Sequence, residues 1–232
     1  MGVPQYILAS SASIFGQQEG IADETSEVFP LTAYSKANRK AEIDNLELND
    51  EEFTVTALRF SSLFGVSPRM RFDIAVNEMV LELYKTKKIT VRGKTNQRPF
   101  LHIKDAAEAY NLVINASKEK IAGQIFNVGT DEQNYQIGTL AEEVSKSIDP
   151  NCKLELGDNK DHRSYFTSFK KIQDVLHFKP QFDVGYGAKE MFSALQNNQI
   201  TDSIDTVTLK WYQHIMSNQK LLKELSIDGK LL

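Results

Sequence analysis

Gln5-Tyr6-Ile7-Leu8-Ala9-Ser10 is a short apolar run, and the small residues Ser11-Ala12-Ser13 follow it directly. An apolar run of this length, closed by small polar residues, predicts a buried strand. Residues 53–60 are rich in β-formers and predict a second strand, while residues 33–48 between the two carry a helical apolar stripe. A strand, a helix and a strand in this order favour a right-handed parallel crossover unit, and hence an α/β fold.

The rest of the chain predicts further helices and short strands. Residues 17–31 are polar, with Gly20 and Pro30, and we expect a loop there. Residues 72–87 repeat apolar side chains at helical spacing, and residues 124–129 predict a third buried strand. A capping box at Thr139-Leu140-Ala141-Glu142 marks a helix start, and residues 207–225 predict a terminal helix.

The composition bounds the class of protein. The 232 residues carry a net charge of −4 and 41% hydrophobic residues, which gives no reason to expect nucleic acid or an anionic membrane as a partner. Cys152 is alone, so it cannot form an internal disulfide, and we expect a cytoplasmic protein. The four histidines have no ligand spacing, so no metal site is expected.

Hydroxyl and guanidinium groups are the candidate functional side chains. Ser10, Ser11 and Ser13 follow the end of a predicted parallel strand, where open α/β sheets bind ligands. Guanidinium groups in general have a fork of donors that matches the geometry of phosphate oxygens. Each feature also has an ordinary structural explanation, because serines are common in turns and arginines in surface ion pairs.

Three segments together carry a family resemblance: Ser10-Ser11-Ala12-Ser13-Ile14-Phe15-Gly16, Thr32-Ala33-Tyr34-Ser35-Lys36-Ala37-Asn38 and Arg98-Pro99-Phe100-Leu101-His102-Ile103-Lys104-Asp105. They resemble the catalytic serine, catalytic tyrosine and substrate-arginine segments of the extended short-chain dehydrogenase/reductase family, which contains the NAD-dependent nucleotide-sugar epimerases and dehydratases. Arg59-Phe60-Ser61-Ser62-Leu63-Phe64-Gly65 and Leu176-His177-Phe178-Lys179-Pro180 resemble further segments of that family.

The resemblance implies a role for each matching residue. Tyr34 and Ser11 would be catalytic, and Tyr34, Asn38 and Ser10 would contact an NAD cofactor. A nucleotide-sugar substrate would be bound by Ser11, Ser13, Asn77, Arg98 and Arg163. The helix that bears Tyr34 would contribute to a homodimer.

The sequence departs from the family pattern at several positions. The family places a lysine four residues after its tyrosine, and Asn38 stands there instead. Ser11-Ala12-Ser13 replaces the Thr-Asp-Glu of the dehydratases, which favours epimerisation or reduction over dehydration. No Gly-x-Gly-x-x-Gly fingerprint for a pyrophosphate is present, so the chain is expected to be N-terminally truncated, with a separate N-terminal half as a further expectation.

These observations predict an α/β protein that contains the C-terminal part of a Rossmann-type parallel sheet and a small mixed α/β substrate-binding domain. We assign residues 1–65 and 89–130 to the Rossmann-type portion, and residues 66–88 and 131–232 to the substrate-binding portion. The expected function is that of an NAD-dependent nucleotide-sugar epimerase. The alternatives are a catalytically inactive nucleotide-sugar-binding or dimerisation remnant, and a gene fragment without independent function.

Overall fold

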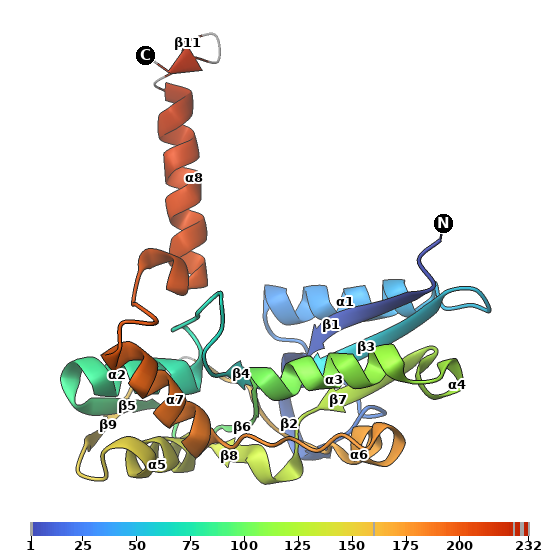
Figure 1. Ribbon diagram of the computed structural model, residues 1–232, viewed down its shortest axis with the longest axis horizontal. Coiled ribbons are helices and arrows are strands. Elements are labelled where there is room, and N and C mark those ends of the chain that lie inside the picture. Colours follow the sequence, from blue (N-terminus) through green and yellow to red (C-terminus); the bar gives the residue numbers. More distant parts are fainter. Residues whose placement is uncertain (1, 160, 225, 228–229, 232) are drawn as a thin grey trace.

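Three parallel strands form the central sheet of the protein in the computed structural model (Figure 1). They are β1 (Gln5–Ser11), β3 (Thr54–Phe60) and β7 (Gln124–Val128), in the order β1-β3-β7. The structure describes residues 2–159, 161–224, 226–227 and 230–231. Every residue of β3 is buried, as expected for the middle strand of a sheet covered on both faces. Helix α1 (Ala33–Leu46) lies along one face, so the expected parallel unit is confirmed.

Short strands extend the architecture beyond this sheet. β4 (Ser62–Phe64) pairs in parallel with β6 (Gln97–His102), and β8 (Asn134–Gln136) pairs antiparallel on the other side of β6. β5 (Lys88–Arg92) pairs in parallel with β9 (Lys153–Gly157). The structure also contains several short elements of two to four residues. They are η1 (Ala12–Phe15), α4 (Lys118–Ile121), η2 (Asp131–Gln133), η3 (Ile204–Thr206), β11 (Ser226–Ile227) and β12 (Lys230–Leu231).

Two expectations about element boundaries were wrong. Part of the expected loop is a strand, β2 (Gln17–Ala22), because β10 (Ser164–Thr167) pairs with it in parallel. A polar, largely exposed segment of this kind carries no apolar signal, and only the partner strand shows that it is extended. Helix α5 (Ile137–Ile148) begins two residues before the predicted capping box, at a start without a side-chain cap.

Two clusters of buried apolar side chains divide the body. One joins β3 and β7 to α3 (Ile103–Asn115) and α6 (Lys170–Leu176). The other joins α5 to α2 (Ala75–Thr86), α7 (Val184–Gln196) and β5. Ile89 and Val91 of β5 therefore pack beside the helices of the second cluster, although the sequence division places residue 89 onward in the Rossmann-type portion.

The predicted terminal helix is confirmed as α8 (Thr208–Glu224), which stands away from the body (Figure 1). None of its side chains is buried. Among the helices that the structure describes, none has the length and apolar character needed to cross a membrane.

A buried ion pair fastens α1 to the central sheet. Arg59, near the end of β3, donates through Nε to Glu42 Oε1 at 2.8 Å and through Nη2 to Glu42 Oε2 at 2.9 Å. Ser10 of β1 donates to Glu42 Oε1 at 2.6 Å, and Arg39 adds a fourth contact at 3.2 Å. Since Glu42 and Arg59 are both fully buried, each needs the other to stay charged inside the protein.

We predict that Glu42→Gln strongly destabilises the protein. The amide keeps the shape of the side chain but leaves the Arg59 guanidinium buried without a counter-charge, which costs about 3 kcal/mol of unfolding free energy. Urea denaturation followed by circular dichroism measures this loss. Glu47→Gln, at the exposed end of the same helix, is the matched control and should change the stability by less than about 0.5 kcal/mol. Equal stabilities for the two variants would contradict the assigned role of the ion pair.

Candidate active site

The serine run lies at the carboxyl end of β1, as the sequence predicts. The buried Ser10 uses its hydroxyl on Glu42. Ser11 caps the short helix η1: its Oγ accepts from the Ser13 amide at 3.2 Å and donates to Ser13 Oγ at 2.9 Å. Ser11 is half-buried and Ser13 is buried, so Ser11 is the more accessible hydroxyl at this end of the sheet.

Tyr34 stands in the first turn of α1. A capping box between Thr32 and Ser35 fixes this helix start, because each side chain bonds the backbone amide of the other residue. The Tyr34 side chain is 61% exposed, so its phenol is open to a ligand. α1 packs against β1, β3 and η1, which brings the turn bearing Tyr34 to the region of the serine run.

Asn38 occupies the position of the family lysine, one turn after Tyr34. Its Nδ2 donates to the backbone carbonyl of Tyr34 at 2.9 Å, so the amide folds back onto its own helix. Lys40 is paired with Asp44 on the same helix. An amide can offer hydrogen bonds to a ribose, but it brings no positive charge to the phenol.

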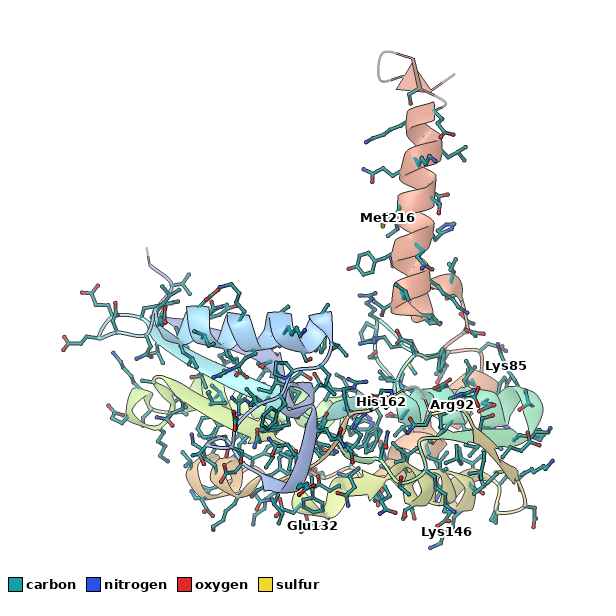
Figure 2. The ribbon with its side chains drawn as sticks, turned by 180° about the vertical axis from the view of Figure 1, so that it is seen from behind. Lys85, Arg92, Glu132, Lys146, His162 and Met216 are labelled. Carbon is teal, nitrogen blue, oxygen red and sulfur yellow. The ribbon has the colours of Figure 1, made fainter. Side chains whose placement is uncertain are left out.

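Arg98 and Arg163 converge on one carboxylate, that of Asp161. Arg98 Nη2 lies 2.8 Å from Asp161 Oδ2, and Arg163 Nη2 lies 2.7 Å from the same oxygen. Arg98 also donates to the backbone carbonyl of Arg163 and lies over the Tyr165 ring at 5.1 Å. Two arginines from distant parts of the sequence thus form a single cationic centre, and Figure 2 labels His162, the residue before Arg163 in the chain.

The charges of this centre act on one another. Burial alone raises the pKa of the Asp161 carboxyl, but the hydrogen bond from Arg163 and the charge of Arg98 outweigh burial and hold this pKa well below its usual value. The hydrogen bond to Asp161 in turn raises the pKa of Arg163, with a smaller contribution from Tyr34.

The substrate-binding candidate Asn77 is engaged elsewhere. It is buried on α2, where its Nδ2 donates to the Arg71 carbonyl at 2.8 Å and its Oδ1 accepts from the Gly65 amide at 3.2 Å. Both ends of the amide fasten residues 65–71 to the helix. The structure thus brings Arg98 and Arg163 together, whereas the Asn77 side chain bonds the loop of residues 65–71.

His102 acts as a helix cap in the core. Its Nδ1 accepts from the Lys104 amide at 3.2 Å, and its Nε2 lies 3.0 Å from Glu190 Oε2. Burial lowers the pKa of His102 although Glu190 opposes the shift, so the neutral ring is favoured. Gly65, at φ +110°, packs so closely that a Cβ there would lie 2.4 Å from the ring. Asp105, in the first turn of α3, accepts from the amides of Gln181 and Phe182.

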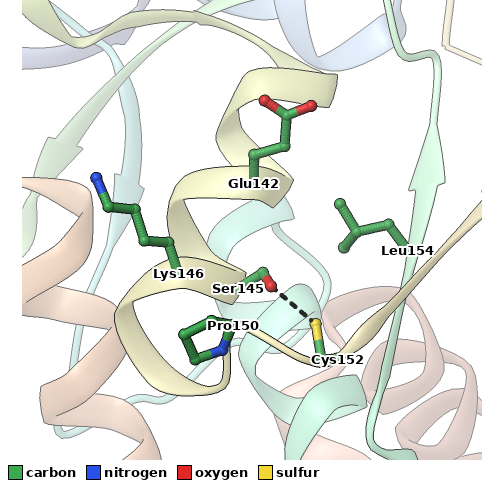
Figure 3. A pocket seen from close by; sticks show the side chains of 6 residues that line it. All are labelled: Glu142, Ser145, Lys146, Pro150, Cys152 and Leu154. Carbon is green, nitrogen blue, oxygen red and sulfur yellow. Dashed lines mark hydrogen bonds between the residues drawn. The ribbon is translucent and has the colours of Figure 1, made fainter.

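Two hollows lie apart from these groups. A pocket of about 320 Å³ is lined by α5 and the start of β9, and Cys152 there donates to Ser145 at 3.1 Å (Figure 3). A second, of about 630 Å³, is lined by Glu24, Arg39 and Arg59 among others. None of the residues lining either hollow is one of the predicted site residues. Within the described part of the chain, no group of three or more His, Cys, Asp or Glu side chains is placed to hold a metal ion.

Sequence reasoning missed Glu42 and Asp161. The sequence shows only that Glu42 is an acidic residue at a fixed spacing from Tyr34 on a predicted helix. Nothing in the sequence indicates that its side chain is buried. Asp161 lies beside Arg163 in the sequence, but Arg98 is more than sixty residues away. Their meeting depends on how β6 packs beside β10.

Known proteins match this chain over most of its length. The uncharacterized UDP-glucose epimerase YtcB of Bacillus subtilis is 23% identical over 184 residues, which cover 77% of this chain and 56% of that protein. A UDP-glucose 4-epimerase of Streptococcus mutans is 25% identical over 206 residues, covering 78% and 60%. The chain therefore spans little more than half the length of these relatives.

Solved structures share the fold. MoeE5 in complex with UDP-glucuronic acid and NAD superposes with a TM-score of 0.74 at 22% identity, covering 85% of this chain and 66% of that one. UDP-glucuronic acid 4-epimerase from Bacillus cereus, also in complex with UDP-glucuronic acid and NAD, gives a TM-score of 0.72 at 19% identity, covering 85% and 63%.

The sequence profile of one family matches the part of the chain that holds the serine run, Tyr34 and Arg98. The match spans residues 1–129 of the 232. This chain therefore belongs to the NAD dependent epimerase/dehydratase family.

Proposed function

We propose that this chain is the catalytic and substrate-binding portion of an NAD-dependent nucleotide-sugar epimerase. The observation that carries the proposal is the convergence of Arg98 and Arg163 on one anion, the carboxylate of Asp161. A pair of guanidinium groups suits a diphosphate, and a ligand held there by its diphosphate can present its sugar to nearby hydroxyls. Two relatives that match more than three quarters of this chain carry names of UDP-glucose epimerases.

Each predicted site residue has a role in this proposal. Tyr34, as the phenolate, takes the proton of a sugar hydroxyl and becomes the phenol, and Ser11 donates a hydrogen bond to the same sugar oxygen. Arg98 and Arg163 hold the diphosphate, so that binding energy away from the reacting carbon positions the sugar. Ser13 supports Ser11 through their mutual hydrogen bond. Asn77 would contribute only indirectly, through residues 65–71.

The residues present fit the reactive end of NAD. Tyr34 and Asn38 offer a phenol and an amide, one helical turn apart, for the hydroxyls of a ribose. Ser10 is less available because its hydroxyl is bonded to Glu42. When bound, NAD would accept a hydride from the sugar and return it. The pyrophosphate needs a Gly-rich dinucleotide-binding fingerprint, and the 232 residues contain no such motif.

The edge position of β1 indicates where that portion would dock. β1 is paired with β3 on one side only within the described sheet. Parallel strands are normally covered on both faces and continued at an open edge. We propose that the dinucleotide-binding portion, in the same polypeptide or in a second one, continues the sheet at β1, and that a homodimer forms through α1. The exposed Ile43 lies on that helix.

The second candidate function is binding without catalysis. The Asn38 amide favours it, because it replaces a cation beside the phenol and is turned back onto the Tyr34 carbonyl. A nucleotide-sugar-binding or dimerisation remnant of the family would keep the arginine pair and lack turnover. The two candidates differ in their response to substitutions at Tyr34 and Asn38.

We predict that Tyr34→Phe lowers turnover by at least about 100-fold, since the group that takes the proton is lost. The measurement is the rate of UDP-glucose epimerisation, with the dinucleotide-binding portion supplied to each protein. The affinity of Tyr34→Phe for UDP-glucose should stay within twofold of wild type. Tyr212→Phe on α8 is the matched control and should leave turnover unchanged. Unaltered turnover in Tyr34→Phe would refute the role of this phenol.

We also predict that Asn38→Lys raises turnover by about tenfold at neutral pH. A lysine four residues after Tyr34 lies on the same helix face, and its charge favours the phenolate form. Asn218→Lys on α8 places the same charge away from the site and should have no effect. The catalytic proposal loses its support if neither the wild type nor Asn38→Lys turns over any nucleotide sugar, and the binding function is then favoured.

A further inference from the structure

The carboxylate of Asp161 occupies the point at which the two arginines meet. Its Oδ2 accepts from Arg163 Nη2 at 2.7 Å and forms an ion pair with Arg98 Nη2 at 2.8 Å. Its Oδ1 accepts from Arg163 Nε at 2.9 Å and from the Arg163 amide at 3.1 Å. One singly charged group therefore receives three hydrogen bonds from Arg163 and an ion-pair contact from Arg98, which leaves the centre with a net charge of +1.

The three side chains differ in how firmly they are held. Arg98 is 7% exposed, lies over the Tyr165 ring and donates to the carbonyls of Gln97 and Arg163. Asp161 is 46% exposed and reaches the centre from the solvent side, in the segment between β9 and β10. Arg98 is therefore the most firmly held side chain of the centre. The Asp161 side chain can move away from the centre with the least loss of packing.

A buried guanidinium explains why the centre needs an anion at all times. Leaving Arg98 unpaired would cost several kcal/mol, because its desolvation would no longer be offset. A carboxylate from the protein provides the pairing when no ligand is bound. A diphosphate carries more charge and more acceptor oxygens than a carboxylate, so exchange with it improves the pairing of both arginines. A ligand with a single negative charge would gain nothing by the same exchange.

We propose that Asp161 is a resident counter-ion of Arg98 and Arg163 that a ligand with two adjacent phosphates displaces. This inference rests on the proposed function, in which these arginines hold the diphosphate of a nucleotide sugar. Asp161 thereby competes with every anion for the centre and lowers its apparent affinity. The exchange selects for diphosphates, and Asp161 turns away from the arginines when one binds.

The test is a calorimetric titration of UDP into the full chain, in the wild type and in two variants. Asp161→Asn removes the competing charge and keeps the shape of the side chain. It should bind UDP about fivefold more tightly, the scale expected for a partly exposed ion pair. Asp158→Asn removes the same charge from an exposed position in the same segment and should stay within twofold of wild type. Circular dichroism checks that each variant folds, and Asp161→Ser serves as a second charge-removing variant.

The outcomes separate the inference from the proposed function. Tighter UDP binding in Asp161→Asn and Asp161→Ser, but not in Asp158→Asn, supports the counter-ion role. Weaker or unchanged binding in both Asp161 variants overturns it, because Asp161 would then position the arginines or contact the ligand itself. The titration of Arg98→Ala tests the proposed function separately. Binding of UDP that survives in Arg98→Ala, or is absent from every protein, removes the diphosphate site and with it both proposals.

Discussion

The buried pair of Glu42 and Arg59 is the constraint on which the arrangement of the site depends. It joins α1 to β3 and, through Ser10, to the end of β1. Glu42 follows Tyr34 by about two helical turns, so the depth and rotation of α1 against the sheet are set where the pair forms. A different docking of the helix would leave a charge buried without its partner, which the protein cannot tolerate. The position of Tyr34 relative to Ser11 follows from this single match.

A second link connects the serine end of the site to its cationic centre. η1 follows Ser11, β2 follows η1, and β2 pairs with β10, the strand directly after Arg163. The Ser164 amide donates to the Gly16 carbonyl at 2.9 Å, and the Phe15 and Tyr165 rings lie 6.0 Å apart. Arg98 packs on the same Tyr165 ring. Hydroxyls at one end and guanidinium groups at the other are thus parts of one continuous packing arrangement, as a ligand with a sugar and a diphosphate requires.

Local patterns in the sequence predicted much of this fold. The apolar runs predicted the three parallel strands, and apolar residues at helical spacing predicted α1, α2 and α8. A helix that buries one face repeats its apolar residues at the helical period, so the sequence shows it. Strand β2 was not predicted, because a polar strand has no apolar pattern and is recognised only from its pairing with another strand. The family motifs predicted site roles for Ser11, Tyr34 and both arginines, and in the structure the two arginines meet at Asp161. Glu42 and Asp161 were missed because their importance lies in contacts between segments far apart in the chain, which no local pattern encodes.

Hydrogen–deuterium exchange with and without UDP-glucose tests most directly the claim that these segments form one nucleotide-sugar site. The account predicts slower exchange at three segments together, residues 10–16, 97–102 and 161–167, because they hold the hydroxyls, Arg98 and Arg163. Residues 142–154, around the pocket of Figure 3, serve as the internal reference and should keep their exchange rates. Protection confined to residues 142–154, or no protection at millimolar UDP-glucose, would contradict the account.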